Sequence, residues 1–97
     1  MDEPWPFDQP PNGVTLTVRS ILEGKAPILW VSHDAEDYGW QFLDGGPADM
    51  SRAAVVALQA IVELDPTVLE VSDLPPGWTA TRETAESDWT RWPPDKR

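Results

Sequence analysis

Two apolar runs separated by a short acidic segment constrain this chain more than any other feature. The runs are Ile28–Ser32 and Tyr38–Leu43, and the segment between them holds the only histidine. A short apolar run bounded by polar residues is typical of a buried strand, and two such runs joined by a short loop indicate a β-hairpin. Within the second run, Trp40 and Phe42 should share one face, because side chains alternate along a strand. We therefore expect a hairpin whose tip gathers His33, Asp34, Glu36 and Asp37.

The segment from Ala48 to Leu64 is rich in alanine, leucine and valine. On a helical wheel its apolar residues cluster on one side, which carries Met50, Ala54, Ala57, Leu58, Ile61 and Leu64. Only Arg52, Gln59 and Glu63 form a polar stripe opposite them. A helix with so narrow a polar stripe is mostly buried. The pattern predicts one long central helix that ends at Asp65–Pro66, because a proline disfavours helical backbone at the residue before it.

The remaining segments are shorter. Val14–Glu23 fits two patterns, alternation as in a strand and apolar residues at helical spacing; we favour a short helix over Thr15–Glu23. Strands are expected at Thr67–Val71, Trp78–Arg82 and Asp88–Trp92. The order helix, hairpin, helix, hairpin predicts a single small α+β domain, with an antiparallel sheet of about four strands packed on one long central helix plus a short N-terminal helix.

Proline content sets the expected boundaries of this domain. Residues 1–13 contain four prolines, Pro4, Pro6, Pro10 and Pro11, which exclude a helix and favour an extended arm. We expect Trp5 and Phe7 to pin this arm to the domain surface, because bare aromatic side chains in a loose tail are unusual. The domain itself is expected over residues 14–92, and residues 93–97 form a polar C-terminal tail.

Charge and composition exclude several classes of function. The 97 residues carry a formal net charge of −10, which disfavours nucleic acid and anionic membranes as partners and favours a basic protein. There is no cysteine, so disulfides, thiolate metal sites and cysteine nucleophiles are excluded. No apolar stretch approaches the ~20 residues that cross a bilayer, and the acidic N-terminus does not resemble a secretory signal. These features predict a cytoplasmic protein.

The hairpin tip is the main candidate for exposed chemistry. A histidine beside carboxylates suits a general base or a metal ligand. However, one histidine cannot supply the three protein ligands usual for catalytic zinc, and the loop does not match a calcium-binding loop. Gly45–Gly46–Pro47 lacks the Gly-Lys-Ser/Thr of a phosphate-binding loop. The alternative is a polar turn whose aspartates satisfy backbone N–H groups. We expect no catalytic residues, no metal and no cofactor.

Six tryptophans are present, and Trp30, Trp40 and Trp78 fall in predicted strands, where they would fill the core. Tryptophans near the ends of the chain are candidates for partner contact. The predicted interaction surface therefore combines the tip with the C-terminal aromatics: His33, Asp34, Glu36, Asp37, Asp44, Trp89 and Trp92. Arg82 could stack on Trp78, pair with Glu70 or Asp73, or contact an acidic ligand, and we favour the structural pairing.

Several motifs recur in an order that resembles a known family. They are Gly39-Trp40-Gln41-Phe42, then Leu64-Asp65-Pro66, then Pro76-Gly77 followed by Arg82 and Trp89. In this order they resemble a family of small bacterial domains of unknown function, grouped with immunity-protein-like domains of toxin systems. The chain departs from the family pattern at the hairpin tip, where His33 and Asp37-Tyr38 replace an expected arginine and Asp-Ser pair. The resemblance implies a non-enzymatic, protein-binding role and carries no catalytic residues.

Three hypotheses follow. The leading one is a non-enzymatic module that binds a basic protein through the acidic hairpin tip, with Asp44 nearby. The alternative is a small enzyme or a metal- or ligand-binding protein that uses His33 with Asp34 and Asp37 in a pocket. The third is an accessory module that packs against another domain or itself through Trp89 and Trp92. The sequence leaves the oligomeric state open.

Overall fold

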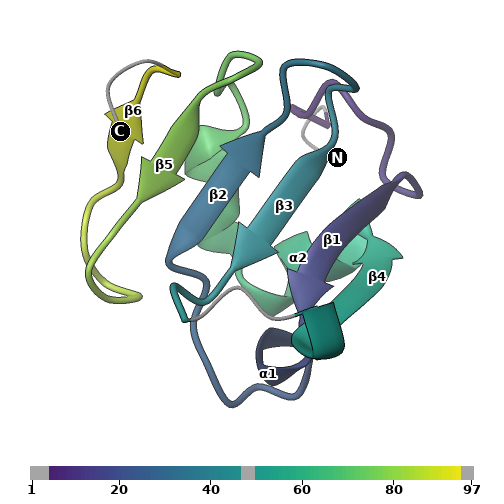
Figure 1. Ribbon diagram of the computed structural model, residues 1–97, viewed down its shortest axis with the longest axis vertical. Helices are drawn as coiled ribbons and strands as arrows, with labels where there is room; N and C mark the ends of the chain where they lie inside the picture. The colour runs from purple at the N-terminus through teal and green to yellow at the C-terminus, as the bar shows by residue number, and fades with distance from the viewer. Residues whose placement is uncertain (1–4, 47–49, 95–97) are drawn as a thin grey trace.

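The computed structural model describes residues 5–46 and 50–94 of the chain. They form a six-stranded mixed sheet with short helices (Figure 1). Along the chain the strands are β1 (Val14–Val18), β2 (Trp30–His33), β3 (Trp40–Leu43), β4 (Ala53–Ala57), β5 (Thr79–Thr81) and β6 (Thr90–Trp92). Their spatial order is β4-β1-β3-β2-β5-β6; β1 and β3 run parallel, and all other neighbours are antiparallel.

The predicted hairpin is confirmed and lies in the middle of the sheet. β2 and β3 pair from Trp30↔Leu43 through His33↔Trp40. Trp40 and Phe42 are both buried on one face, as the alternation predicts, while Gln41 lies on the other. A central hairpin that is buried on one face anchors the rest of the sheet, because every other strand adds to one of its two edges.

The predicted long helix is wrong. Residues 53–57 form strand β4, which pairs with β1 without a bulge, and only Leu58–Leu64 form helix α2. A 3₁₀ turn, η1 (Met50–Arg52), precedes β4; Ala48 and Asp49 lie outside the described residues. A run of alanine and valine is compatible with both the helical and the strand periodicity of apolar residues. Pairing with β1 decides in favour of the strand. The single-helix, four-stranded antiparallel arrangement is thereby replaced by a six-stranded mixed sheet.

The predicted N-terminal helix is also mostly a strand. Val14–Val18 form β1, and α1 covers only Arg19–Leu22. The alternation along β1 is real, but it buries two threonines, Thr15 and Thr17, while Val14 and Leu16 lie on the other face. Thr17 Oγ1 donates to the carbonyl of Phe42 at 2.7 Å, so the buried hydroxyl is satisfied.

The predictions for the C-terminal third have mixed outcomes. The strands expected at Trp78–Arg82 and Asp88–Trp92 are confirmed as the shorter β5 and β6. The strand expected at Thr67–Val71 is wrong, because Pro66–Val71 form a 3₁₀ helix, η2. The Asp65 carboxylate caps it by accepting the Thr67 N–H at 3.1 Å, and Pro66 occupies its first turn. This cap and proline favour helical over extended backbone at this point.

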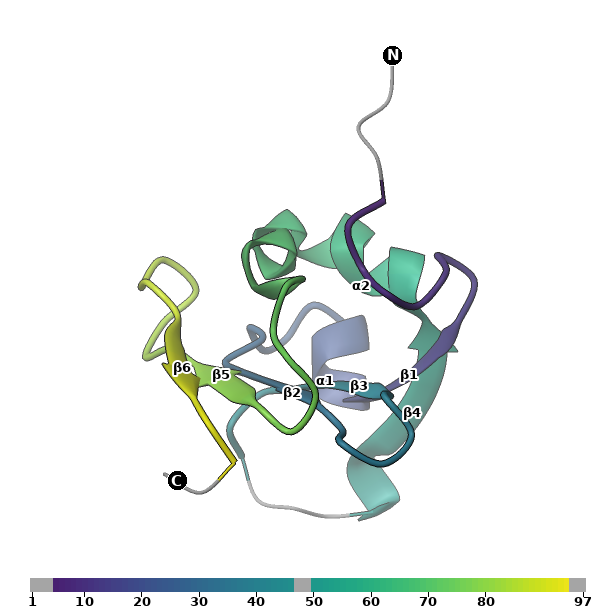
Figure 2. The same cartoon turned by 90° about the horizontal axis from the view of Figure 1, so that it is seen from above.

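Helix α2, the 3₁₀ helix η2 and the N-terminal segment cover one face of the sheet. Figure 2 shows α2 and η2 on one side, with the segment that leads into β1 beside them. The core lies between these layers and contains Phe7, Val18, Ile21, Ile28, Val31, Trp40, Phe42, Leu58, Ile61, Val68, Val71, Leu74 and Ala80. Over residues 5–46 and 50–94, no α-helix packs on the other face, which looks toward the viewer in Figure 1. We call this the open face.

None of the helices in the described part of the chain is both long and apolar enough to cross a membrane.

Candidate functional site

The hairpin tip is a turn built by its own aspartates. Asp34 Oδ1 accepts the backbone N–H of Glu36 at 2.7 Å, and Asp37 Oδ1 accepts the N–H of Gly39 at 2.8 Å. Tyr38 adopts a left-handed conformation with φ of 60°, which turns the chain back into β3. Aspartate side chains thus accept backbone N–H groups at the tip, as expected for a polar turn without a catalytic role. The Oδ2 atom of each aspartate accepts no hydrogen bond from residues 5–46 and 50–94, so each keeps a free oxygen.

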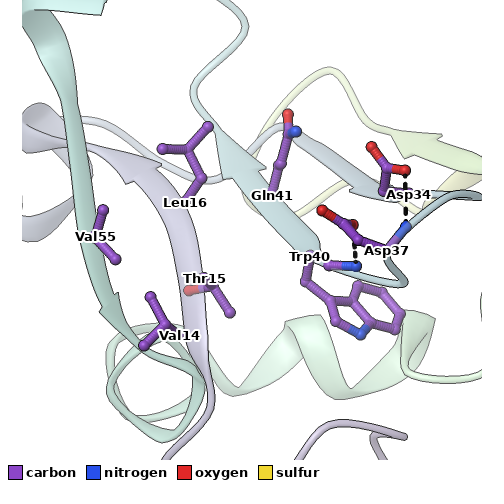
Figure 3. A pocket seen from close by; sticks show the side chains of 9 residues that line it. Val14, Thr15, Leu16, Asp34, Asp37, Trp40, Gln41 and Val55 are labelled. Atoms are coloured by element: carbon purple, nitrogen blue, oxygen red, sulfur yellow. Dashed lines mark hydrogen bonds between the residues drawn. The ribbon is translucent and has the colours of Figure 1, made fainter.

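A pocket of about 240 Å³ lies beside this tip, where β1 runs parallel to β3 and antiparallel to β4. Figure 3 shows its two sides. Val14 and Leu16 of β1 and Val55 of β4 supply apolar side chains, and Asp34 and Asp37 supply carboxylates across from the valines. We call these five residues the acidic pocket.

The hairpin tip carries negative charge that forms no ion pair with an arginine or lysine of the described residues. Within the described part of the chain, the arginine and lysine ion pairs are Lys25–Glu23, Arg52–Asp44, Arg82–Asp65 and Arg91–Asp73. None of these pairs includes Asp34, Glu36 or Asp37. Two carboxylates beside an apolar wall can attract a cation that brings its own apolar surface.

His33 is not part of this pocket. Its side chain is 4% exposed and stacks on Trp40 with ring centroids 4.0 Å apart, on the helix-covered side of the sheet. Nδ1 lies 2.6 Å from the carbonyl oxygen of Leu74, and Nε2 lies 3.0 Å from Asp8 Oδ2 without the alignment of a hydrogen bond. The expectation that His33 shares an exposed site with Asp34 and Asp37 is therefore corrected, because strand alternation places His33 in the core.

Asp44 is not near the tip either. It follows β3, at the end of the hairpin opposite the tip, where it forms an ion pair with Arg52 and accepts a hydrogen bond from Ser20 Oγ at 2.7 Å. Burial alone would raise the pKa of the Asp44 carboxyl. The Gly46 N–H, the Ser20 hydroxyl and the Arg52 guanidinium outweigh burial and lower that pKa below its ordinary value. Asp44 is thus a structural ion-pair residue joining α1 to the start of β4.

Trp89 and Trp92 lie at the far edge of the sheet from the acidic pocket (Figure 1). Trp89 is half-buried beneath Arg82, whose guanidinium carbon is 4.1 Å from the ring centroid. Trp92 is 36% exposed and donates from Nε1 to Thr81 Oγ1 at 2.9 Å. The predicted surface is therefore divided among separate places, and self-association through these tryptophans stays a prediction.

Arg82 does not have the partners that the sequence suggested. It pairs with Asp65 rather than Glu70 or Asp73, and it stacks on Trp89 rather than Trp78. The pairing places the guanidinium between the start of η2 and the segment that follows β5. The partners of Arg82 come from other segments of the chain, so the side-chain alternation of β5 alone does not predict them.

Two groups of residues escaped the sequence analysis. Val14, Leu16 and Val55 line the acidic pocket, and the alternation of the first two was the available signal for their strand. Asp8 lies in the proline-rich segment and gave no signal as the partner of His33. Among the described residues, no group of three or more histidine, aspartate or glutamate side chains is arranged to hold a metal ion.

Comparison of the chain with protein-family models, with characterised proteins and with solved structures finds no match. The resemblance to immunity-protein-like domains stays a prediction from the sequence motifs.

Proposed function

We propose that this protein is a non-enzymatic binding module that holds a basic segment of another protein against the open face of its sheet. The observation that carries the proposal is the acidic pocket, where apolar side chains of two strands face two carboxylates that no described cation neutralises. Thr15 and Gln41 are the other polar side chains that line this pocket.

The chemistry of lysine and arginine matches this arrangement. Each has an aliphatic stem that packs on apolar surface and a cationic head that stays at its edge. A stem lying over Val14, Leu16 and Val55 would bring its head toward Asp34 and Asp37, whose Oδ2 atoms have no described partner. The net charge of −10 would also speed the approach of a basic protein, because long-range attraction raises association rates.

The resemblance to immunity-protein-like domains supports a narrower form of the proposal, in which the partner is a toxin that the module occludes. The acidic pocket supports the basic character of such a partner. It does not require that the partner be a toxin, so this form depends on the sequence motifs alone.

A matched pair of charge variants tests the proposal. Asp34→Asn/Asp37→Asn keeps the side-chain oxygens that build the turn and removes both charges from the pocket. Glu63→Gln/Glu86→Gln removes the same charge from exposed positions on α2 and on the loop before β6. Both are compared with the natural chain by fluorescence anisotropy with labelled hexalysine, at low and high salt.

We expect the pocket variant to bind hexalysine roughly tenfold more weakly at low salt, as two partly desolvated ion pairs predict, and the control variant to stay within about twofold. If both variants weaken equally, net charge alone governs binding and the acidic pocket is not the site. If only the pocket variant weakens, the partner can be sought in a lysate of the native host. It is the protein that the natural chain captures and the pocket variant does not.

A further inference from the structure

The segment of residues 5–13, which we call the N-terminal strap, is docked on the helix-covered side of the domain. Phe7 is 6% exposed and meets Trp40 edge to face, with ring centroids 5.0 Å apart. The carbonyls of Gly13 and Pro11 accept the N–H groups of Leu58 and Gln59 at 2.8 and 2.9 Å. Because α2 has no side-chain N-cap, the strap supplies the acceptors that its first turn needs.

Asp8 joins the strap to the hairpin through both of its carboxylate oxygens. Trp40 Nε1 donates to Oδ1 at 2.9 Å, and His33 Nε2 lies 3.0 Å from Oδ2. The Asp8 side chain is 48% exposed, whereas that of His33 is 4% exposed. A half-exposed carboxylate on a short segment thus closes over a buried imidazole.

The hydrogen bond at Nδ1 determines whether Nε2 carries a hydrogen in neutral His33. The carbonyl oxygen of Leu74 can only accept, so Nδ1 must carry a hydrogen in this contact. In neutral His33 the proton is then absent from Nε2, which lies 3.0 Å from Asp8 Oδ2. Two acceptors 3.0 Å apart repel each other. A proton on Nε2 turns the repulsion into an ion pair.

Few other groups near His33 could interact with a charge on its imidazole. The rings of Trp40, from β3, and Tyr38, from the hairpin tip, lie 4.0 and 6.3 Å from the imidazole between centroids. Neither side chain brings a carboxylate or a basic group to the imidazole. The carboxylate of Asp34, the next residue along the chain, lines the acidic pocket on the open face instead. Within residues 5–46 and 50–94, Asp8 is the charged group that contacts His33.

We propose that the N-terminal strap is a proton-linked latch: uptake of a proton by His33 tightens the strap onto the sheet, and loss of that proton loosens it. The latch is on the opposite side of the sheet from the acidic pocket and does not depend on its function.

Exchange of the Trp40 indole N–H with solvent measures the latch, because the strap covers this group. Rates are corrected for the intrinsic pH dependence of exchange, and the Val31 amide in the sheet centre reports opening of the whole domain. Asp8→Asn is the decisive variant. It keeps an oxygen acceptor for Trp40 Nε1 and removes the charge that faces His33, at a position exposed enough to leave folding intact.

We expect protection of the Trp40 indole in the natural protein to be roughly fivefold higher at pH 5 than at pH 8, with Val31 unchanged. In Asp8→Asn the ratio should fall below about twofold. Glu83→Gln, which removes one exposed charge after β5, should behave like the natural protein. Equal protection at both pH values in the natural protein, or a fivefold ratio that persists in Asp8→Asn, would overturn the latch.

Discussion

Arg82 Nη2 lies 2.7 Å from Asp65 Oδ2, and this ion pair ties the start of η2 to the end of β5. The arginine side chain is 1% exposed, and its Nε also donates to the carbonyl of Ile28 at 2.9 Å. One side chain thereby joins three segments that are distant in sequence. Its removal should affect the stability of the whole domain.

Arg82→Ala should lower the free energy of unfolding by about 3 kcal/mol, because loss of one partner leaves a carboxylate and a carbonyl without their donor. Urea unfolding followed by tryptophan fluorescence measures the change. Arg19→Ala, at an exposed position, is the control and should stay within about 0.5 kcal/mol of the natural protein. A small effect of Arg82→Ala would show that solvent replaces these contacts.

Asp44 predicts a dependence of stability on acidic pH. Its pKa is lowered in the folded protein, so its ionised form stabilises the fold. That contribution is complete above the ordinary aspartate pKa and is lost as pH falls through the folded-state value. Asp44→Asn should therefore cost about 1 kcal/mol at pH 6 and progressively less toward pH 2. A cost that stays constant over this range, measured by urea unfolding, would contradict the assignment.

The contact between His33 and Leu74 predicts an uncommon tautomer. Because the carbonyl accepts from Nδ1, neutral His33 should carry its proton on Nδ1 rather than on Nε2. Long-range ¹H–¹⁵N correlation spectra at pH 8 distinguish the two forms, and the assignment is unambiguous because the chain has one histidine. Detection of the Nε2–H form would mean that the Leu74 contact is absent in solution.

Phe7 tests whether the N-terminal strap belongs to the core. Phe7→Ala should lower the free energy of unfolding by about 3 kcal/mol, because it empties a buried site beside Trp40. Pro10→Ala changes an exposed position of the same segment and should have an effect below about 0.5 kcal/mol. If the two variants unfold alike in urea, the strap is not held by packing of Phe7.

Local signals were sufficient for the central hairpin. Its two apolar runs, its turn aspartates and the shared face of Trp40 and Phe42 lie close together in the sequence. Strand alternation puts His33 on the same face as the buried Val31, and the hairpin register places it opposite Trp40. The prediction that His33 belongs to the exposed tip was wrong, although its place two residues after Val31 already indicated a buried side chain.

Residues 53–57 show where local information ends. Alanine and valine are compatible with both a helix and a strand, and the choice depends on β1, which pairs with all five positions. The same pairing brings Val55 beside Val14 and Leu16 and so forms the apolar wall of the acidic pocket. A helix over this segment would have left Asp34 and Asp37 without that wall.

The sequence by itself determined the charge, the absence of thiol chemistry, the hairpin and the acidic turn at its tip, because these depend on composition or on neighbours along the chain. Only the tertiary structure decided the parallel pairing of β1 with β3, the open face, and the contacts of Asp8 with His33 and of Arg82 with Asp65. These relationships join segments far apart in sequence. Their formation depends on which of several compatible pairings buries the most apolar surface while satisfying the buried polar groups.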